Sequence, residues 1–169
     1  MSKKKKILVL GHARHGKDTV AEMIKKEFGL TFESSSIAAA RIFLYDTLKE
    51  KYGYTSPEQC FEDRVNHRAE WYDLICKYNE VDKARLAKMI LEKDDMYVGM
   101  RDEAEIEACM NQGVFDLIIG VYDPRKPLEP KNSFNIDLWK ACDLIIPNAE
   151  GLLELKYRVL DLAPLIKAA

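Results

Sequence analysis

The stretch from Ile7 to Val20, ILVLGHARHGKDTV, decides the fold of this chain. Its first four residues form an aliphatic run, which is typical of a strand covered on both faces. Gly11, Gly16 and Lys17 follow with the spacing GxxxxGK. In such a loop the glycines let backbone amides turn toward one centre, and the lysine reaches phosphate oxygens. The stretch therefore predicts a phosphate-binding loop directly after a buried strand.

A helix is expected after this loop. The residues that follow Lys17 have the period of an amphipathic helix, and Gly29 provides its end. The apolar positions of the helix are Val20, Met23, Ile24 and Phe28. The order of strand, loop and helix favours a phosphate-binding loop over an ordinary glycine turn.

The residue after Lys17 departs from the usual pattern, because Asp18 stands where a serine or threonine normally binds magnesium. A carboxylate binds this hard cation more strongly than a hydroxyl does, but it repels phosphates when the metal is absent. The helix dipole also favours an acid in the first turn. Asp18 is therefore either a metal ligand or a helix-start acid, or both. Thr19 is placed to donate to an α-phosphate.

Composition excludes several classes of protein. Of 169 residues, 47% are hydrophobic and 32% charged, as in a globular domain, and we expect one domain over residues 1 to 169. The net charge of −2 provides no general attraction to nucleic acid, although a local basic patch remains open. No apolar run is long enough for a membrane span or a signal peptide. The cysteines, Cys60, Cys76, Cys109 and Cys142, form no CxxC pair, so we expect reduced thiols in a cytoplasmic protein.

Short apolar runs alternate with longer stretches of helical period, a pattern that predicts an α/β fold with a mainly parallel sheet. The five candidate strands are residues 7 to 10, 30 to 34, 96 to 100, 115 to 122 and 144 to 146.

Several helices are expected between the candidate strands. One runs from residue 36 or 37 to Tyr52, and a second begins at the capping residue Ser56, where Gln59 can close a capping box. The second has a predicted buried stripe of Phe61, Val65, Ala69, Tyr72 and Cys76. A third covers residues 82 to 92. Residues 56 to 93 would then form a helical insertion between the second and third strands.

Three further segments complete the predicted architecture. A helix from Asp102 to Gln112 has Asp102 and Glu105 spaced as a capping pair. Three prolines break the stretch from residue 123 to 134 into a short, lid-like loop. The chain ends in an amphipathic helix with Leu152, Leu155, Val159 and Leu162 on one side.

GHARHGKDTVA, residues 11 to 21, resembles the phosphate loop of phage-type deoxynucleoside monophosphate kinases, which belong to the P-loop nucleoside monophosphate kinase superfamily. The resemblance implies a three-layer P-loop NTPase fold, a five-stranded mainly parallel sheet, and ATP with Mg²⁺ as phosphoryl donor. It makes Asp18 a family variant and a candidate metal ligand. The donor-binding residues it implies are Gly11, Arg14, His15, Gly16, Lys17, Asp18, Thr19 and, in the turn after the last strand, Asn148.

A kinase that brings two polyanions together needs arginines to offset their repulsion. The candidates for acceptor binding are Ser35, Arg41, Arg64, Arg68 and Arg101. Arg101 falls where a strand ends, which is where parallel sheets bind ligands. Lys17, Arg101 and, from the lid-like loop, Arg125 are the candidate catalytic residues, with Lys126 assisting Arg125.

Several of these residues are also suited to a purely structural part. Arg41 fits an exposed helix face equally well, and Arg101 fits a surface ion pair. Arg64 and Arg68 lie four residues apart and share a helix side, which could be solvated or could meet a DNA backbone. His12 and His15 are not expected to act as bases. We found no acidic strand end suited to magnesium.

The resemblance, together with the additional arginines, thus implies transfer of a phosphoryl group from ATP to a nucleoside or deoxynucleoside monophosphate. One alternative keeps the kinase chemistry but places the acceptor hydroxyl on a modified base in DNA. Another is an ATP-binding module without catalysis, which the missing hydroxyl after Lys17 favours and the additional arginines oppose. Both a monomer and a homodimer are compatible with the sequence.

Overall fold

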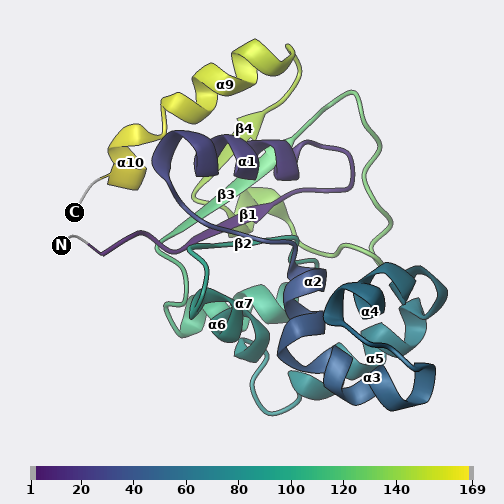
Figure 1. Cartoon of the computed structure of the whole chain (residues 1–169). Helices are drawn as coiled ribbons and strands as arrows, with labels where there is room; N and C mark the ends of the chain where they lie inside the picture. The colour runs from purple at the N-terminus through teal and green to yellow at the C-terminus, as the bar shows by residue number, and fades with distance from the viewer. Residues whose placement is uncertain (1–2, 168–169) are drawn as a thin grey trace.

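The computed structural model describes residues 3 to 167 and is an α/β fold in three layers. Figure 1 shows a parallel sheet with helices on both faces. The strands are β1 (Ile7–Leu10), β2 (Met96–Val98), β3 (Leu117–Tyr122) and β4 (Leu144–Pro147). The α-helices are α1 (Lys17–Phe28), α2 (Ser35–Ala39), α3 (Tyr45–Tyr52), α4 (Pro57–Asp63), α5 (Arg68–Tyr78), α6 (Arg85–Leu91), α7 (Glu103–Asn111), α8 (Leu138–Ala141), α9 (Leu152–Leu160) and α10 (Ala163–Lys167). A π-helical turn η1 (Ala40–Leu44) joins α2 to α3, and a 3₁₀ turn η2 (Arg64–Asn66) follows α4.

The sheet is entirely parallel and has the strand order β2-β1-β3-β4. The chain leaves β1 for one side of the sheet and then crosses back to the other, so β1 lies where the direction of winding changes. Open parallel sheets bind ligands beyond the carboxyl ends of their strands at this point. The loop that follows β1 is the predicted phosphate loop.

The second of the five predicted strands, residues 30 to 34, is wrong. Leu30 is buried, but only Thr31 pairs with the sheet region, where its carbonyl accepts from the amides of Asp95 and Met96. Ser34 then caps α2, because its hydroxyl accepts from Ser36 N at 3.3 Å. The cap turns the chain away before a ladder can form beside β2, and the described sheet has four strands.

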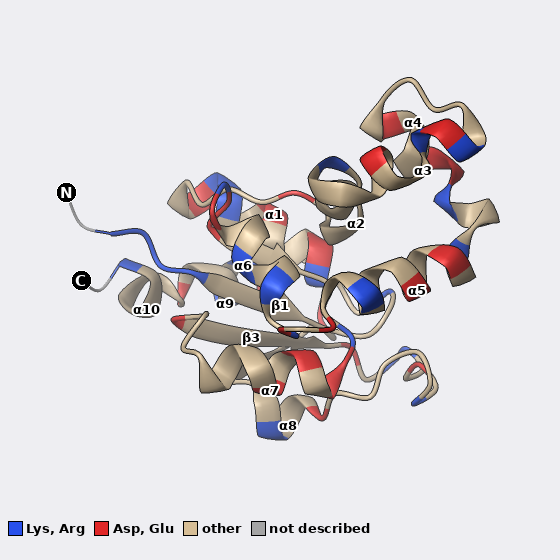
Figure 2. Ribbon diagram, turned by 90° about the horizontal axis from the view of Figure 1, so that it is seen from below, with Lys and Arg blue, Asp and Glu red and all other residues tan. Residues whose placement is uncertain are grey.

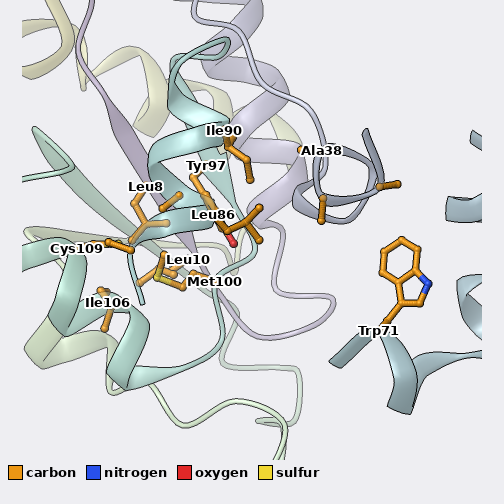
Figure 3. Close-up of a cluster of buried hydrophobic side chains, with 14 of the residues drawn as sticks. Leu8, Leu10, Ala38, Trp71, Leu86, Ile90, Tyr97, Met100, Ile106 and Cys109 are labelled. Carbon is orange, nitrogen blue, oxygen red and sulfur yellow. The ribbon is translucent and has the colours of Figure 1, made fainter. Parts of the chain in front are cut away.

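Alternate residues of the strands supply two separate cores. On one face, β1 residues Ile7 and Val9 pack in a cluster with α1, α9 and α10. On the other face, Leu8 and Leu10 join a cluster that includes residues of α6, α7 and α8. Figure 3 shows this second cluster, with Leu8 and Leu10 close to Ile106 and Cys109 of α7. The sheet is therefore covered on both faces, as continuous apolar strands require.

Helices α2 to α5 form a lobe beside the sheet (Figure 1). The predicted single helix after Ser56 is wrong in this lobe, because η2 and His67 separate α4 from α5. The interruption changes the helical phase. Val65 is 54% exposed and Tyr72 69% exposed, whereas Trp71 is buried instead. Of the predicted stripe, Phe61 is partly buried, and Ala69 and Cys76 are exposed.

Smaller differences occur at helix ends. The Ser56 cap is confirmed, but the amide oxygen of Gln59 accepts from Thr55 N rather than from Ser56 N. Leu152 is 69% exposed, so it does not share the buried side of α9 with Leu155 and Val159. The first residue of α9 projects from the layer, and Leu162 is buried in the turn after the helix.

Candidate phosphate-binding site

The carboxyl ends of all four strands meet at one edge of the sheet. β1 leads into Gly11, β2 into Arg101, β3 into Asp123 and β4 into Asn148. Each of these residues follows a strand that the sequence predicted separately. Their common edge brings the predicted loop and the predicted strand-end arginine together.

The predicted phosphate loop leads into α1 through a left-handed glycine and leaves the start of this helix without a side-chain cap. Gly16 has φ 101° and caps α1 without a side-chain hydrogen bond. The first amides of a helix have no partner within it, so those at the start of α1 are free to meet an anion. A side chain at Gly16 would come within 2.5 Å of Asn148 Nδ2, and one at Gly11 within 2.9 Å of Val121 O. Both positions therefore require glycine for close packing.

Arg14 lies at the exposed tip of this loop with φ 67°. It is the one residue other than glycine with a positive φ among residues 3 to 167. A left-handed backbone costs an L-residue roughly 1–2 kcal/mol. This strain is a feature often found at ligand-binding loops.

Lys17 and its neighbours line the start of α1. The Lys17 side chain is only 12% exposed, and its Nζ lies 3.9 Å from Asp18 Oδ2. The Asp18 side chain is 77% exposed, and Thr19 is also exposed. A carboxylate so placed is accessible to a cation. Within residues 3 to 167 no three His, Cys, Asp or Glu side chains gather in a way that could hold a metal ion. Magnesium bound at Asp18 would therefore need phosphate oxygens and water as further ligands.

His15 and Asn148 hold the loop in place. His15 is completely buried; its Nδ1 accepts from Asp123 N at 3.0 Å, so Nε2 carries the proton and donates to Pro127 O at 3.0 Å. Asn148 Nδ2 donates to His15 O at 3.1 Å. These contacts give His15 and the Asn148 side chain a structural part in shaping the cradle.

His12 attaches a second segment to the loop. Its Nδ1 accepts from Glu129 N at 2.9 Å, and its ring centroid lies 4.1 Å from that of Phe134. Burial, followed by the charge of His15, lowers the pKa of His12, which keeps its ring neutral and able to accept. The predicted lid-like loop is therefore docked on the phosphate loop.

Arg101 faces the phosphate loop through an acidic residue, Glu129, that the sequence pattern does not reveal. Arg101 Nη1 donates to Glu129 Oε1 at 2.5 Å, and Glu129 Oε2 accepts from Ala13 N at 3.0 Å. Both the strand-end arginine and a phosphate-loop amide thus contact one carboxylate. No pattern around Glu129 signals this contact, because its partners lie far away in the chain.

Asp123 is a second acid that the sequence reasoning missed. It is buried at the end of β3, next to the strand that carries the phosphate loop. Arg125 binds it with two hydrogen bonds of 2.9 Å, and this pairing lowers the pKa of Asp123 to about 2. The sequence signal was present, since Asp123 directly follows an apolar strand, and an aspartate can hold Mg²⁺ next to a phosphate loop. Arg125 points at Asp123 here, and not into open space above the cradle.

The other acceptor candidates are spread over the lobe. Ser35 begins α2 next to the end of β2, where its hydroxyl would lie 3.3 Å from a side chain at Gly99. Arg41 forms ion pairs with Glu33 and with Glu58, the latter at 2.9 Å. Arg41 is therefore neutralised by acids of its own lobe.

Arg64 and Arg68 do not lie on one continuous helix. Arg64 Nη1 donates to Phe61 O at 2.8 Å, and its guanidinium lies 3.8 Å from the Phe61 ring centroid. It caps the end of α4. Arg68 is exposed at the start of α5. The shared helix side that the sequence predicted is wrong, because η2 intervenes.

A cavity of about 500 Å³ lies beside the lid-like loop. Glu129, Phe134 and Trp139 are among its lining residues, and His12 is the phosphate-loop residue that reaches it. None of the helices described is both long and apolar enough to cross a bilayer.

Comparison of the chain with protein-family models gives no match, and comparison with curated proteins gives none either. The geometry of the strand ends and the spacing of the residues therefore carry the functional assignment. They describe a parallel α/β protein with a glycine-containing, lysine-bearing loop at the carboxyl end of β1, an inner strand of the sheet.

Proposed function

We propose that this protein is a P-loop kinase that transfers the γ-phosphoryl group of ATP to a nucleoside or deoxynucleoside monophosphate. The observation that carries the proposal is the position of the GxxxxGK loop between β1 and an uncapped α1, with Arg101 linked to the Ala13 amide of that loop through Glu129. A simple phosphate-binding loop does not need this additional arginine. A kinase does, because two polyanions must approach one another.

The residues have distinct parts in such a transfer. Amides at the start of α1 and Lys17 would bind the donor's phosphates, and Arg101 would offset the charge of the transferring or accepting phosphate. An oxygen of the acceptor's phosphate attacks the γ-phosphorus, and the bond to the β-phosphate oxygen breaks, which gives ADP and a nucleoside diphosphate. Magnesium supplies charge neutralisation between donor phosphates when bound. Asp18 is the accessible carboxylate beside Lys17, and Asp123 is the buried one beneath the loop.

The proposal extends to fold and setting. A sheet of order β2-β1-β3-β4 with a phosphate loop after its central strand is compatible with a P-loop NTPase fold, with four strands in place of the expected five. We assign the protein to nucleotide metabolism of the phage type, in the cytoplasm of the host cell. The acceptor is then a free small molecule, and the enzyme is a monomer or a homodimer.

The decisive experiment is a coupled assay of ADP formation with ATP–Mg²⁺ and a panel of ribo- and deoxyribonucleoside monophosphates. We expect turnover with at least one acceptor. Lys17→Ala should lower kcat by about 100-fold or more, since it removes a charge aimed at the transferring group. Lys26→Ala is the matched control, because Lys26 is exposed farther along the same helix.

The alternatives give different results in this assay. A non-catalytic module would bind ATP through Lys17 but would show no turnover, whichever acceptor is offered. Equal turnover rates for Lys17→Ala and Lys26→Ala would show that the phosphate loop takes no part in the transfer. A kinase that acts on modified DNA would show turnover only when DNA is supplied as acceptor, and none with any free nucleoside monophosphate.

A further inference from the structure

Glu129 occupies an unusual position for an acidic side chain. Its Oε2 accepts from Ala13 N at 3.0 Å, and its Oε1 accepts from Arg101 Nη1 at 2.5 Å. The side chain is only 18% exposed. A carboxylate therefore bridges an amide of the phosphate loop and the arginine at the end of β2.

The surroundings of Glu129 favour an anion. Burial raises the pKa of Glu129, but the hydrogen bonds from Arg101 and Ala13 outweigh this effect and hold the pKa below its usual value. The charge of Glu129 in turn raises the pKa of neighbouring His12, against the larger lowering by burial. The carboxylate thus satisfies donors that a phosphate group would also satisfy.

The main chain around Glu129 is tied to the same region by neutral contacts. Glu129 N donates to His12 Nδ1 at 2.9 Å, and Asn135 N donates to Arg101 O at 3.2 Å. Phe134 packs against the ring of His12. A ligand that displaced the carboxylate would therefore disturb a segment whose other contacts also lie at the phosphate loop and the end of β2.

We propose that the Glu129 carboxylate holds the place of a ligand's phosphate group at a subsite formed by Ala13 N and Arg101, and that the two anions exchange on binding. The inference rests on the proposed function, since it assigns a phosphate ligand to this cradle. A phosphate that accepts from both Ala13 N and Arg101 Nη1 needs the two donors that Glu129 now occupies. The Glu129 side chain leaves these two donors when the phosphate enters, and we expect the segment from Pro127 to Phe134 to shift with it.

The cavity next to this subsite provides a natural reporter. Trp139 lines the cavity together with Glu129 and is 64% exposed, whereas Trp71 is buried in the lobe of α2 to α5. Protein labelled with 5-fluorotryptophan would give one ¹⁹F resonance for each, and Trp139→Phe would assign them. Displacement of Glu129 should shift the Trp139 resonance and leave that of Trp71 unchanged.

Glu129→Gln is the test variant, because it keeps the shape of the side chain and removes its charge. Glu103→Gln is the matched control, since Glu103 lines the same cavity from α7. We expect Glu129→Gln to bind the phosphate ligand about tenfold more tightly or better, as an ionic hydrogen bond no longer competes. Its Trp139 resonance without ligand should already lie near the ligand-bound position of the wild type.

Titrations with ATP, with ADP, and with each monophosphate in the presence of ADP identify the phosphate. Tighter binding of ATP but not ADP assigns the subsite to the donor's terminal group. Tighter binding of the monophosphate assigns it to the acceptor. If the wild type binds and turns over nucleotides while Glu129→Gln has wild-type affinities, the exchange is wrong and the proposed function stands. If neither protein binds any of these nucleotides, both proposals are overturned.

Discussion

Glu105, in the first turn of α7, is a partly buried carboxylate. Burial, followed by the charge of Asp102, raises the pKa of Glu105 to about 7. In the unfolded chain a glutamate has a pKa of about 4.3. Between about pH 4.3 and pH 7, therefore, Glu105 is protonated in the folded protein and ionised in the unfolded chain. The contribution of Glu105 to stability therefore falls as the pH rises from about 4.5 to 7 and stays lowered above it.

Glu105→Gln should remove this penalty. A shift of two to three pKa units corresponds to about 3 kcal/mol, which is the gain in the free energy of unfolding that we expect at pH 8. At pH 4.5 the variant and the wild type should differ little, because the side chain is protonated in the folded protein. Urea unfolding at both pH values measures the difference. Glu107→Gln, at an exposed position of the same helix, should show no such pH-dependent gain.

At the scale of elements, the phosphate loop, the end of β3 and the lid-like loop are joined through one buried ring. His15 accepts from Asp123 N and donates to Pro127 O. His15→Leu would leave the buried amide of Asp123 without a partner, which costs about 1–3 kcal/mol. The Pro127 carbonyl is in an exposed residue and can turn to water. We expect the free energy of unfolding to drop by that amount.

Trypsin provides a second measurement for this joint. Lys131 is exposed in the lid-like loop, and cleavage after it should become faster in His15→Leu than in the wild type. His15→Gln can both accept and donate, so it should recover part of the stability and of the resistance to trypsin. Equal behaviour of the leucine and glutamine variants would show that ring packing, and not hydrogen bonding, holds the loops together.

These contacts also show what could be predicted for the elements. Strands β1, β3 and β4 and the phosphate loop were predictable, because continuous apolar runs and GxxxxGK are local signals. The break at η2 was not, since capping and periodicity near Ser56 suggested one long helix. Residues 30 to 34 have the composition of a strand, but the Ser34 cap directs the chain elsewhere. The contacts of His15 with Asp123 and of Glu129 with Ala13 join residues more than a hundred positions apart, which no spacing reveals.

At the scale of the whole molecule, acidic and basic residues alternate along the ribbon in Figure 2, and the net charge is −2. Arg41, Arg101 and Arg125 each contact an acid, and Arg64 contacts a carbonyl. A nucleic-acid site would instead direct several arginines or lysines outward along one surface. This distribution supports a small nucleotide, held in one cradle, over a DNA acceptor.

The charge distribution predicts weak binding to DNA, whether or not the DNA carries hydroxymethylated bases. We expect dissociation constants of about 100 µM or weaker for a labelled duplex at 150 mM salt. Because the logarithm of affinity falls by about 0.9 for each phosphate contact per tenfold rise in salt, the slope should be shallower than about −2. Fluorescence anisotropy over a series of salt concentrations measures both the dissociation constant and the slope. Arg68→Ala, which alters an exposed arginine of α5, should leave both unchanged.

The contradicting outcome is submicromolar binding with a slope of about −4 or steeper that is weakened in Arg68→Ala. Such a result would indicate that the acceptor is DNA and not a free nucleotide. It would also make the lobe of α2 to α5 a second binding surface, because Arg68 belongs to that lobe and the cradle alone offers too few cations for such a slope.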